Sequence, residues 1–186
     1  MIVNYIGHGG INALSSERVV TRQTIKNWTN FNKLSLFITG TCEFSRFDAS
    51  SNTEDATSAG ETVILSESGG AIVMLTTARV SYAGTNLTLN DNFYDYLFSS
   101  ENEKYYTIGD AYFKAKNDMN NSYNALFFTY LGNPAIRLQY PINKVHTSTI
   151  NGVEFENFND TLRALQRVTI TGFVSTPDNN LSLIHI

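Results

Sequence analysis

The chain has 186 residues, of which 42% are hydrophobic, so its length and composition fit one domain with a packed core, or one domain and part of another. Its formal net charge of −4, with no run of lysine or arginine, argues against nucleic acid as a main partner. No apolar stretch approaches the roughly 18 residues that a membrane span needs. The single cysteine excludes an intrachain disulfide and a zinc site built from several cysteines.

Two apolar runs near the start of the chain predict buried strands, over residues 2–6 and 34–41. The first run leads into Gly7-His8-Gly9 and the second into Gly40-Thr41-Cys42, where glycine permits sharp turns and close backbone approach. Two parallel neighbours would bring His8 and Cys42 to the same carboxyl edge of a sheet. In open α/β sheets that edge is where ligands bind.

Loops and one helix are expected around the second strand. Residues 11–20 have the composition of a polar loop. Ile25 and Trp28 recur at helical spacing, which predicts a helix over 21–31 with Thr21 as its N-cap. Residues 50–57 are polar throughout and are expected to form a surface loop.

A further helix and strand define the fold class. Ser58 and Glu61 have the spacing of a capping box, which predicts a helix running to about Ser68 and closed by Gly69-Gly70. A third buried strand follows over 71–76. Parallel strands joined by a helix require a right-handed crossover. The expected fold is therefore α/β, a parallel sheet flanked by helices.

The remainder of this region predicts two helices and a closing strand. The helices are expected near 90–98 and over 107–120, the second opened by Thr107 and Asp110 as a capping box. The type of 125–131 stays open between helix and strand. Residues 135–138 are expected to form a short strand after the turn at 132–134.

The composition changes after Pro141. Three β-branched segments follow, over 145–150, 153–155 and 168–174, with a turn signal at Asn151-Gly152. We therefore expect two domains, an α/β domain over 1–141 and a partial, truncated β-rich domain over 142–186, the start of an Ig-like β-sandwich.

His8 and Cys42 suggest a base and a nucleophile. A thiol attacks as its thiolate, and a nearby imidazole promotes that form. The backbone N–H groups of Gly9 and Cys42 are candidates for an oxyanion hole. Cys42 follows His8 by 34 positions, an order that also fits a caspase-like arrangement.

Other interpretations of these residues remain open. His8 can be a turn residue and Cys42 a small buried hydrophobe, since free cysteine is among the most buried residue types. The glycine-rich turn lacks the spacing of a dinucleotide fingerprint, and no cofactor is expected. No metal site is expected either, because a solvated acidic loop explains the carboxylates after Cys42 more simply than a cation site does: Glu43, Asp48, Glu54 and Asp55.

Several motifs in combination resemble one family. Asn4-Tyr5-Ile6-Gly7-His8-Gly9 followed by Gly40-Thr41-Cys42 is similar to the gingipain family of cysteine peptidases, which share the caspase-like fold. Further similar segments extend over nearly the whole chain: 41–48, 58–61, 69–72, 76–79, 92–98, 131–138 and the β-rich tail. The segments from 41–48 to 92–98 look closer to the sortases of the type IX secretion system than to the gingipains themselves. Asn133 is a departure, since Asp is usual there.

The resemblance implies that His8 is the general base and Cys42 the nucleophile of a cysteine peptidase or transpeptidase. The implied substrates are secreted cargo proteins, which lose a C-terminal sorting signal and are joined to a surface glycolipid. The implied location is the cell surface, on the outer membrane, with other secretion-system surface proteins as partners. Arg79 and Tyr82 would form a wall of the substrate pocket.

The resemblance also implies an incomplete site. The family's earlier strands, an acidic partner of His8 and part of the specificity pocket are expected upstream of this chain. A signal peptide is expected there too, because residues 1–5 lack the basic and apolar regions of one. Two alternatives stay open: a gingipain-like secreted endopeptidase that hydrolyses proteins, and a non-catalytic surface scaffold module.

Overall fold

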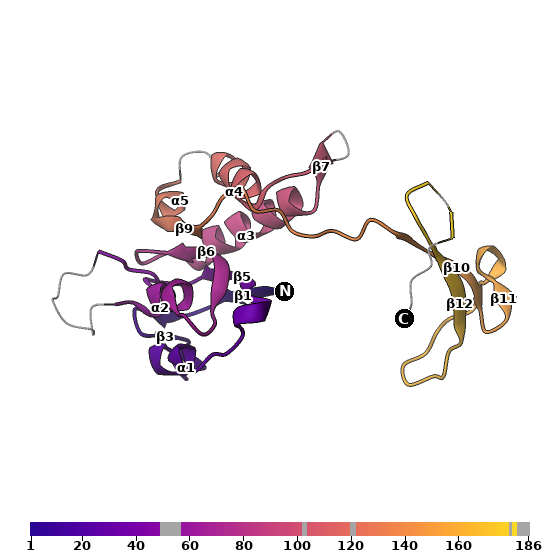
Figure 1. The fold of residues 1–186 in the computed structure, drawn as a ribbon, viewed down its shortest axis with the longest axis horizontal. Coiled ribbons are helices and arrows are strands. Elements are labelled where there is room, and N and C mark those ends of the chain that lie inside the picture. Colours follow the sequence, from indigo (N-terminus) through magenta and orange to yellow (C-terminus); the bar gives the residue numbers. More distant parts are fainter. Residues whose placement is uncertain (49–56, 102–103, 120–121, 179, 182–186) are drawn as a thin grey trace. The chain divides into compact units, whose positions relative to one another are not determined.

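In the computed structural model, the chain divides into two compact units, Met1–Leu138 and Gln139–Ile186 (Figure 1). The structure describes residues 1–48, 57–101, 104–119, 122–178 and 180–181. Apart from residue 57, the surface loop expected over 50–57 lies outside these residues. In the described part of the chain, no helix is both long and apolar enough to cross a bilayer.

A four-stranded sheet with the order β1-β5-β6-β9 forms the centre of the first unit. The strands are β1 (Ile2–Ile6), β5 (Ser35–Gly40), β6 (Ala71–Thr77) and β9 (Phe128–Gly132). β1, β5 and β6 are parallel, whereas β9 is antiparallel to β6. The strands predicted over 2–6, 34–41 and 71–76 are present, and the predicted α/β fold class is confirmed.

Helices cover both faces of this sheet, α1 and α2 on one side and α3 and α4 on the other (Figure 1). The helices are α1 (Arg22–Lys26), α2 (Ala59–Leu65), α3 (Ala83–Leu97), α4 (Ile108–Asn117), α5 (Tyr123–Phe127) and the 3-10 turn η1 (Phe31–Lys33). Successive strand residues point to opposite faces. Leu36 and Ile38 therefore join the core under α3 and α4, while Phe37 joins the core under α1 and α2.

The N-caps of the first two helices are as predicted, but both helices end early. Thr21 opens α1 and Ser58 opens α2, each with a capping box. α1 stops at Lys26 because the chain turns to pair the Asn30 side chain with the backbone of Gly70, at 2.8 and 2.9 Å. α2 stops at Leu65, and Gly70, at φ +113, lies beyond its C-cap rather than closing it.

Three other expectations need correction. Residues 11–20 are not only loop, because β2 (Gly9–Gly10), β3 (Ala13–Leu14) and β4 (Val20–Thr21) form a small antiparallel sheet there. α3 begins at Ala83 instead of near 90, since its N-cap, Tyr82, makes no side-chain capping bond and leaves no sequence signal.

The strand expected over 135–138 is wrong. The backbone of this segment and of the preceding turn instead accepts hydrogen bonds from the start of α4. Ile108 N donates to Ile136 O at 2.8 Å, and Gly109 N donates to Pro134 O at 3.1 Å. The segment left open, 125–131, contains the end of α5 and most of β9. A short β7–β8 hairpin pairs Ser100–Glu101 with Lys104–Tyr105.

The second unit holds a three-stranded antiparallel sheet, β11-β10-β12. Its elements are β10 (Lys144–Ile150), β11 (Val153–Glu154), η3 (Phe155–Asn157) and β12 (Ile170–Ser175). The predicted turn joins β10 to β11, with Asn151 and Gly152 at φ 51 and 81. An Ig-like domain and a boundary between 141 and 142 stay predictions.

Candidate functional site

The ends of β1 and β5 lie side by side, as the sequence predicts for parallel neighbours. Ile6 is in register with Gly40, and Gly7 N donates to Gly40 O at 3.2 Å. Gly9 packs so closely on the next strand end that an added Cβ would collide with the Thr41 hydroxyl. The turn that carries His8 therefore contacts the residue preceding Cys42.

The backbone of His8 is fixed, while its side chain is exposed. His8 O accepts hydrogen bonds from Tyr5 Oη at 2.6 Å and from Ser15 N at 2.7 Å. Among the interactions of the described residues, neither ring nitrogen of His8 makes a hydrogen bond. The imidazole is thus attached to a held turn and has room to rotate.

Cys42 lies in a more enclosed setting. Its thiol is partly buried and donates to Ser81 O at 3.6 Å. The two residues after Glu43, Phe44 and Ser45, are fully buried. The structure brings the His8 and Cys42 strand ends together but, over the described residues, has no hydrogen bond between thiol and imidazole. Such bonds are often long or absent until substrate binds.

A chain of hydrogen bonds between buried polar side chains lies behind Cys42. Asn124 Nδ2 donates to Asn86 Oδ1 at 3.1 Å, and Asn86 Nδ2 donates to Ser81 Oγ at 2.9 Å. Ser81 Oγ donates in turn to Thr41 O, also at 2.9 Å. Sequence analysis missed Ser81, Asn86 and Asn124, because no local pattern marks partners that lie 38 and 40 positions apart in the chain.

Arg79 and Tyr82, the predicted pocket wall, lie on the segment that follows β6. The Arg79 guanidinium makes a bidentate pair with Asp48, with Nη1 2.8 Å from Oδ1. This hydrogen-bonded pair lowers the pKa of Asp48 and raises that of Arg79. Arg79 is thus engaged with a loop residue, whereas Tyr82 is 72% exposed. Their contact with substrate stays a prediction.

The predicted oxyanion donors are the N–H groups of Gly9 and Cys42, on the two adjacent strand ends. The next N–H along, that of Glu43, is already bonded to Arg79 O at 3.2 Å. Glu43 also has φ 52, a left-handed conformation that turns the chain sharply after Cys42. The oxyanion role of Gly9 and Cys42 stays a prediction.

Glu17 is an acidic residue near His8 that sequence analysis did not select. Its pKa is lowered, mainly by its own backbone N–H and, to a smaller extent, by the charge of His8. The β2–β3 hairpin explains this proximity, since it returns the chain to Ser15, whose N–H binds His8 O. Glu17 itself is exposed.

The carboxylates after Cys42 are engaged by arginines. Glu43 pairs with Arg46 at 3.2 Å and Asp48 with Arg79. Within the described ranges there is no group of three or more His, Cys, Asp or Glu side chains that could hold a metal ion. Glu54 and Asp55 lie outside those ranges.

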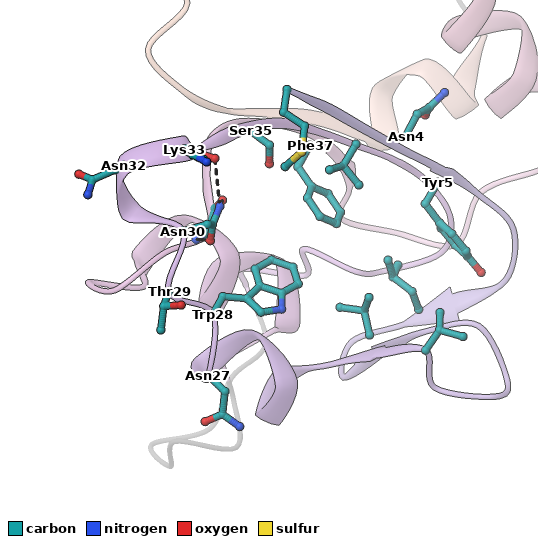
Figure 2. A pocket seen from close by; sticks show the side chains of 16 residues that line it. Asn4, Tyr5, Asn27, Trp28, Thr29, Asn30, Asn32, Lys33, Ser35 and Phe37 are labelled. Carbon is teal, nitrogen blue, oxygen red and sulfur yellow. Dashed lines mark hydrogen bonds between the residues drawn. The ribbon is translucent and has the colours of Figure 1, made fainter.

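A large hollow of about 880 Å³ lies elsewhere, beside β1 and the α1–β5 connection (Figure 2). Trp28 and Phe37 form apolar parts of its wall, and Asn4 and Asn30 are among its polar groups. His8, Cys42, Arg79 and Tyr82 do not line it. We place the candidate active site at the strand ends because the nucleophilic chemistry is there.

The fold, a parallel-containing sheet with helices on both faces, matches the caspase-like fold of the gingipains. The model of Peptidase family C25 matches residues 1–139. The chain therefore belongs to peptidase family C25, which confirms the resemblance to the gingipains and the predicted cysteine-endopeptidase family.

Solved structures are similar in fold. The crystal structure of the Arg-specific cysteine proteinase gingipain R (RgpB) has a TM-score of 0.65 and 18% identity, covering 78% of this chain and 36% of that one. A complex of the Porphyromonas gingivalis RgpB pro- and mature domains has a TM-score of 0.65 and 17% identity, and the match again covers 78% of this chain and 36% of that one. A third structure, described as that of a protease, has a TM-score of 0.60 and 17% identity. That match covers 96% of this chain and 46% of the other. The chain thus spans less than half of these proteins, and no curated protein matches it.

Proposed function

We propose that this chain carries the nucleophile and general base of a cysteine endopeptidase or transpeptidase. The observation that supports it best is the register of β1 on β5, Ile6 against Gly40, because His8 and Cys42 each follow one of these paired residues by two positions. The family match spans both residues. The activity belongs to the full-length protein, of which this chain supplies the dyad.

In the proposed reaction, His8 takes the thiol proton and Cys42 Sγ attacks the scissile carbonyl carbon. The carbonyl oxygen becomes an oxyanion, held by the N–H groups of Gly9 and Cys42. Collapse of this intermediate breaks the C–N bond, and His8 gives its proton to the leaving amine. The products are a free amine and a thioester on Cys42. A second nucleophile, water or an amine, then releases the acyl group.

We further propose that the second nucleophile is an amine and that the protein is a sortase of the PorU type, from the type IX secretion system. The resemblance of the motifs around Cys42 and over 92–98 to those of the sortases favours this branch over the gingipains. Its substrates would be secreted cargo proteins with C-terminal signals, its partners other secretion-system proteins, and its site of action the cell surface.

Replacement of the nucleophile tests the proposal. In the full-length protein, Cys42→Ala should abolish labelling by a thiol-directed peptide warhead and make unprocessed cargo accumulate. The matched control is Ser66→Ala, at the half-buried C-cap of α2 and away from the strand ends. Normal cargo maturation in the Cys42→Ala protein would contradict the proposal.

The alternatives separate in two further experiments. Incubation with cargo and an amine acceptor gives a joined product with a sortase and a hydrolysed product with a gingipain-like endopeptidase. A non-catalytic scaffold would show Cys42 alkylation by iodoacetamide only near and above the usual thiol range, around pH 8.5. Reactivity that persists well below that pH would exclude the scaffold.

A further inference from the structure

One peptide group, between Ser81 and Tyr82, connects the thiol of Cys42 to a distant helix. Its carbonyl oxygen, Ser81 O, accepts the hydrogen bond from Cys42 Sγ at 3.6 Å. Its N–H, on Tyr82, donates to Asn124 Oδ1 at 2.9 Å. Because both polar atoms of one planar unit are engaged, Asn124 controls the direction in which the carbonyl points.

The orientation of the Asn124 side chain is determined by its partners. Tyr82 N–H can only donate, so the atom facing it is the amide oxygen of Asn124. Asn124 Nδ2 is then directed to Asn86 Oδ1, and Asn86 Nδ2 to Ser81 Oγ. The chain ends on Thr41 O, which can only accept. Each of these four hydrogen bonds thus joins a donor to an acceptor, and neither amide can be reversed without loss of a bond.

These groups are buried, so water does not replace a lost partner. The exposed fractions of Asn86 and Asn124 are 4% and 3%, and that of Ser81 is 9%. A hydrogen bond on the peptide N–H also strengthens its carbonyl as an acceptor. Freeing the Tyr82 N–H therefore weakens the bond that holds the thiol as well as the orientation of the peptide.

We propose that Asn124 is a positioning residue for Cys42: it holds the 81–82 peptide so that Ser81 O keeps the thiol in one resting orientation. The thiol leaves this orientation when it ionises and turns toward substrate. The catalytic meaning of this role rests on the proposed peptidase function, but the contact itself does not.

Two variants of the full-length protein separate positioning from general destabilisation. Asn124→Ala and Asn86→Ala both remove a buried amide and the same Asn124–Asn86 bond. Only Asn124→Ala frees the Tyr82 N–H. The first readout is the rate of Cys42 carbamidomethylation by iodoacetamide at pH 7, well below the unfolding temperature of either variant. The second is hydrogen exchange at the Tyr82 amide.

Asn124→Ala should alkylate about three- to tenfold faster than wild type, the factor that corresponds to one ordinary hydrogen bond. Asn86→Ala should stay within about twofold, since its Tyr82–Asn124 bond survives. Tyr82 exchange should accelerate in Asn124→Ala alone. Equal alkylation rates in the two variants, or a slower rate in Asn124→Ala, would overturn the proposal.

Two controls keep the result interpretable. If Asn124→Ala does not fold, Asn124→Ser leaves a hydroxyl too short to reach the Tyr82 N–H and is judged by the same rates. Labelling by the thiol-directed peptide warhead and processing of cargo are measured in parallel on wild type. Absence of both would count against the peptidase function, while the alkylation comparison would still decide the role of Asn124.

Discussion

The two strand ends that meet at the candidate site are held in different ways. The β5 end continues into buried residues, with Phe44 and Ser45 fully enclosed and the polar chain of Ser81 behind Cys42. The β1 end carries an exposed His8, which the described residues hold through hydrogen bonds to its backbone oxygen. In the proposed dyad, the nucleophile would therefore lie on a buried, well-held strand end and the base on an exposed turn.

The largest expected effect concerns the anchor of the β5 end. Phe44→Ala should destabilise the protein by about 3–5 kcal/mol, the usual cost of emptying a buried phenylalanine site. Phe44 is fully buried in the core that α1 and α2 cover. Phe47→Ala, at a position 52% exposed, is the matched control and should change stability by less than about 0.5 kcal/mol. Urea unfolding measures both, and similar losses would mean that Phe44 is not an anchor.

The contact between the two ends can be broken at Gly9. Gly9→Ala should cost about 1–3 kcal/mol, because the new Cβ meets the Thr41 hydroxyl and lies 3.2 Å from Ala13 O. It should also reduce activity more than stability, since the His8 turn moves away from Cys42. Gly10→Ala is the control, with no atom within 4 Å of its added Cβ. Equal activities of the two variants at equal folded fractions would argue against this contact.

A smaller effect is expected where the β1 end is held. Tyr5→Phe removes the hydrogen bond from Tyr5 Oη to His8 O and should cost about 0.5–1.5 kcal/mol. The loss should appear in thermal unfolding and in a less ordered His8 ring. Tyr123→Phe, at a position 82% exposed, should leave both unchanged. An unaltered His8 environment by NMR in Tyr5→Phe would show that Ser15 N–H alone holds the turn.

The smallest effect concerns acid pH and the Arg79–Asp48 pair. Because the pKa of Asp48 is lowered in the folded protein, its stabilising contribution is present above the ordinary carboxyl pKa and is lost as the pH falls through the lowered value. Asp48→Asn should therefore flatten the decline of the melting temperature between about pH 5 and 2. Both groups are exposed, so the change should be slight and sensitive to salt. An identical pH profile would mean that the pair adds nothing.

Local signals account for what could be predicted. Three apolar runs, two of them followed by or ending in glycine, predicted three strands, and Thr21 and Ser58 predicted two helix starts, because a strand core and a capping box are encoded in a few adjacent residues. The adjacency of His8 and Cys42 followed from parallel pairing. These local features were therefore sufficient to predict the fold class and the candidate dyad.

Long-range partners account for what could not. α3 starts at Ala83 without a capping side chain, and the segment before Gln139 binds the start of α4 instead of forming a strand. Asn124 binds the Tyr82 N–H although the two residues are 42 positions apart in the sequence, and neither periodicity nor composition predicts a contact at that separation. The sequence therefore predicted Cys42 as a nucleophile but not the groups that contact it.

The alkylation of Cys42 across pH in wild type and in His8→Ala tests the central claim most directly. The chain has one cysteine, and peptide mass mapping assigns the modification to it. If His8 is the base of a Cys42 nucleophile, wild type should react well below pH ~8.5 and His8→Ala should lose that low-pH reactivity. Superimposable profiles, both confined to the ordinary thiol range, would contradict the dyad.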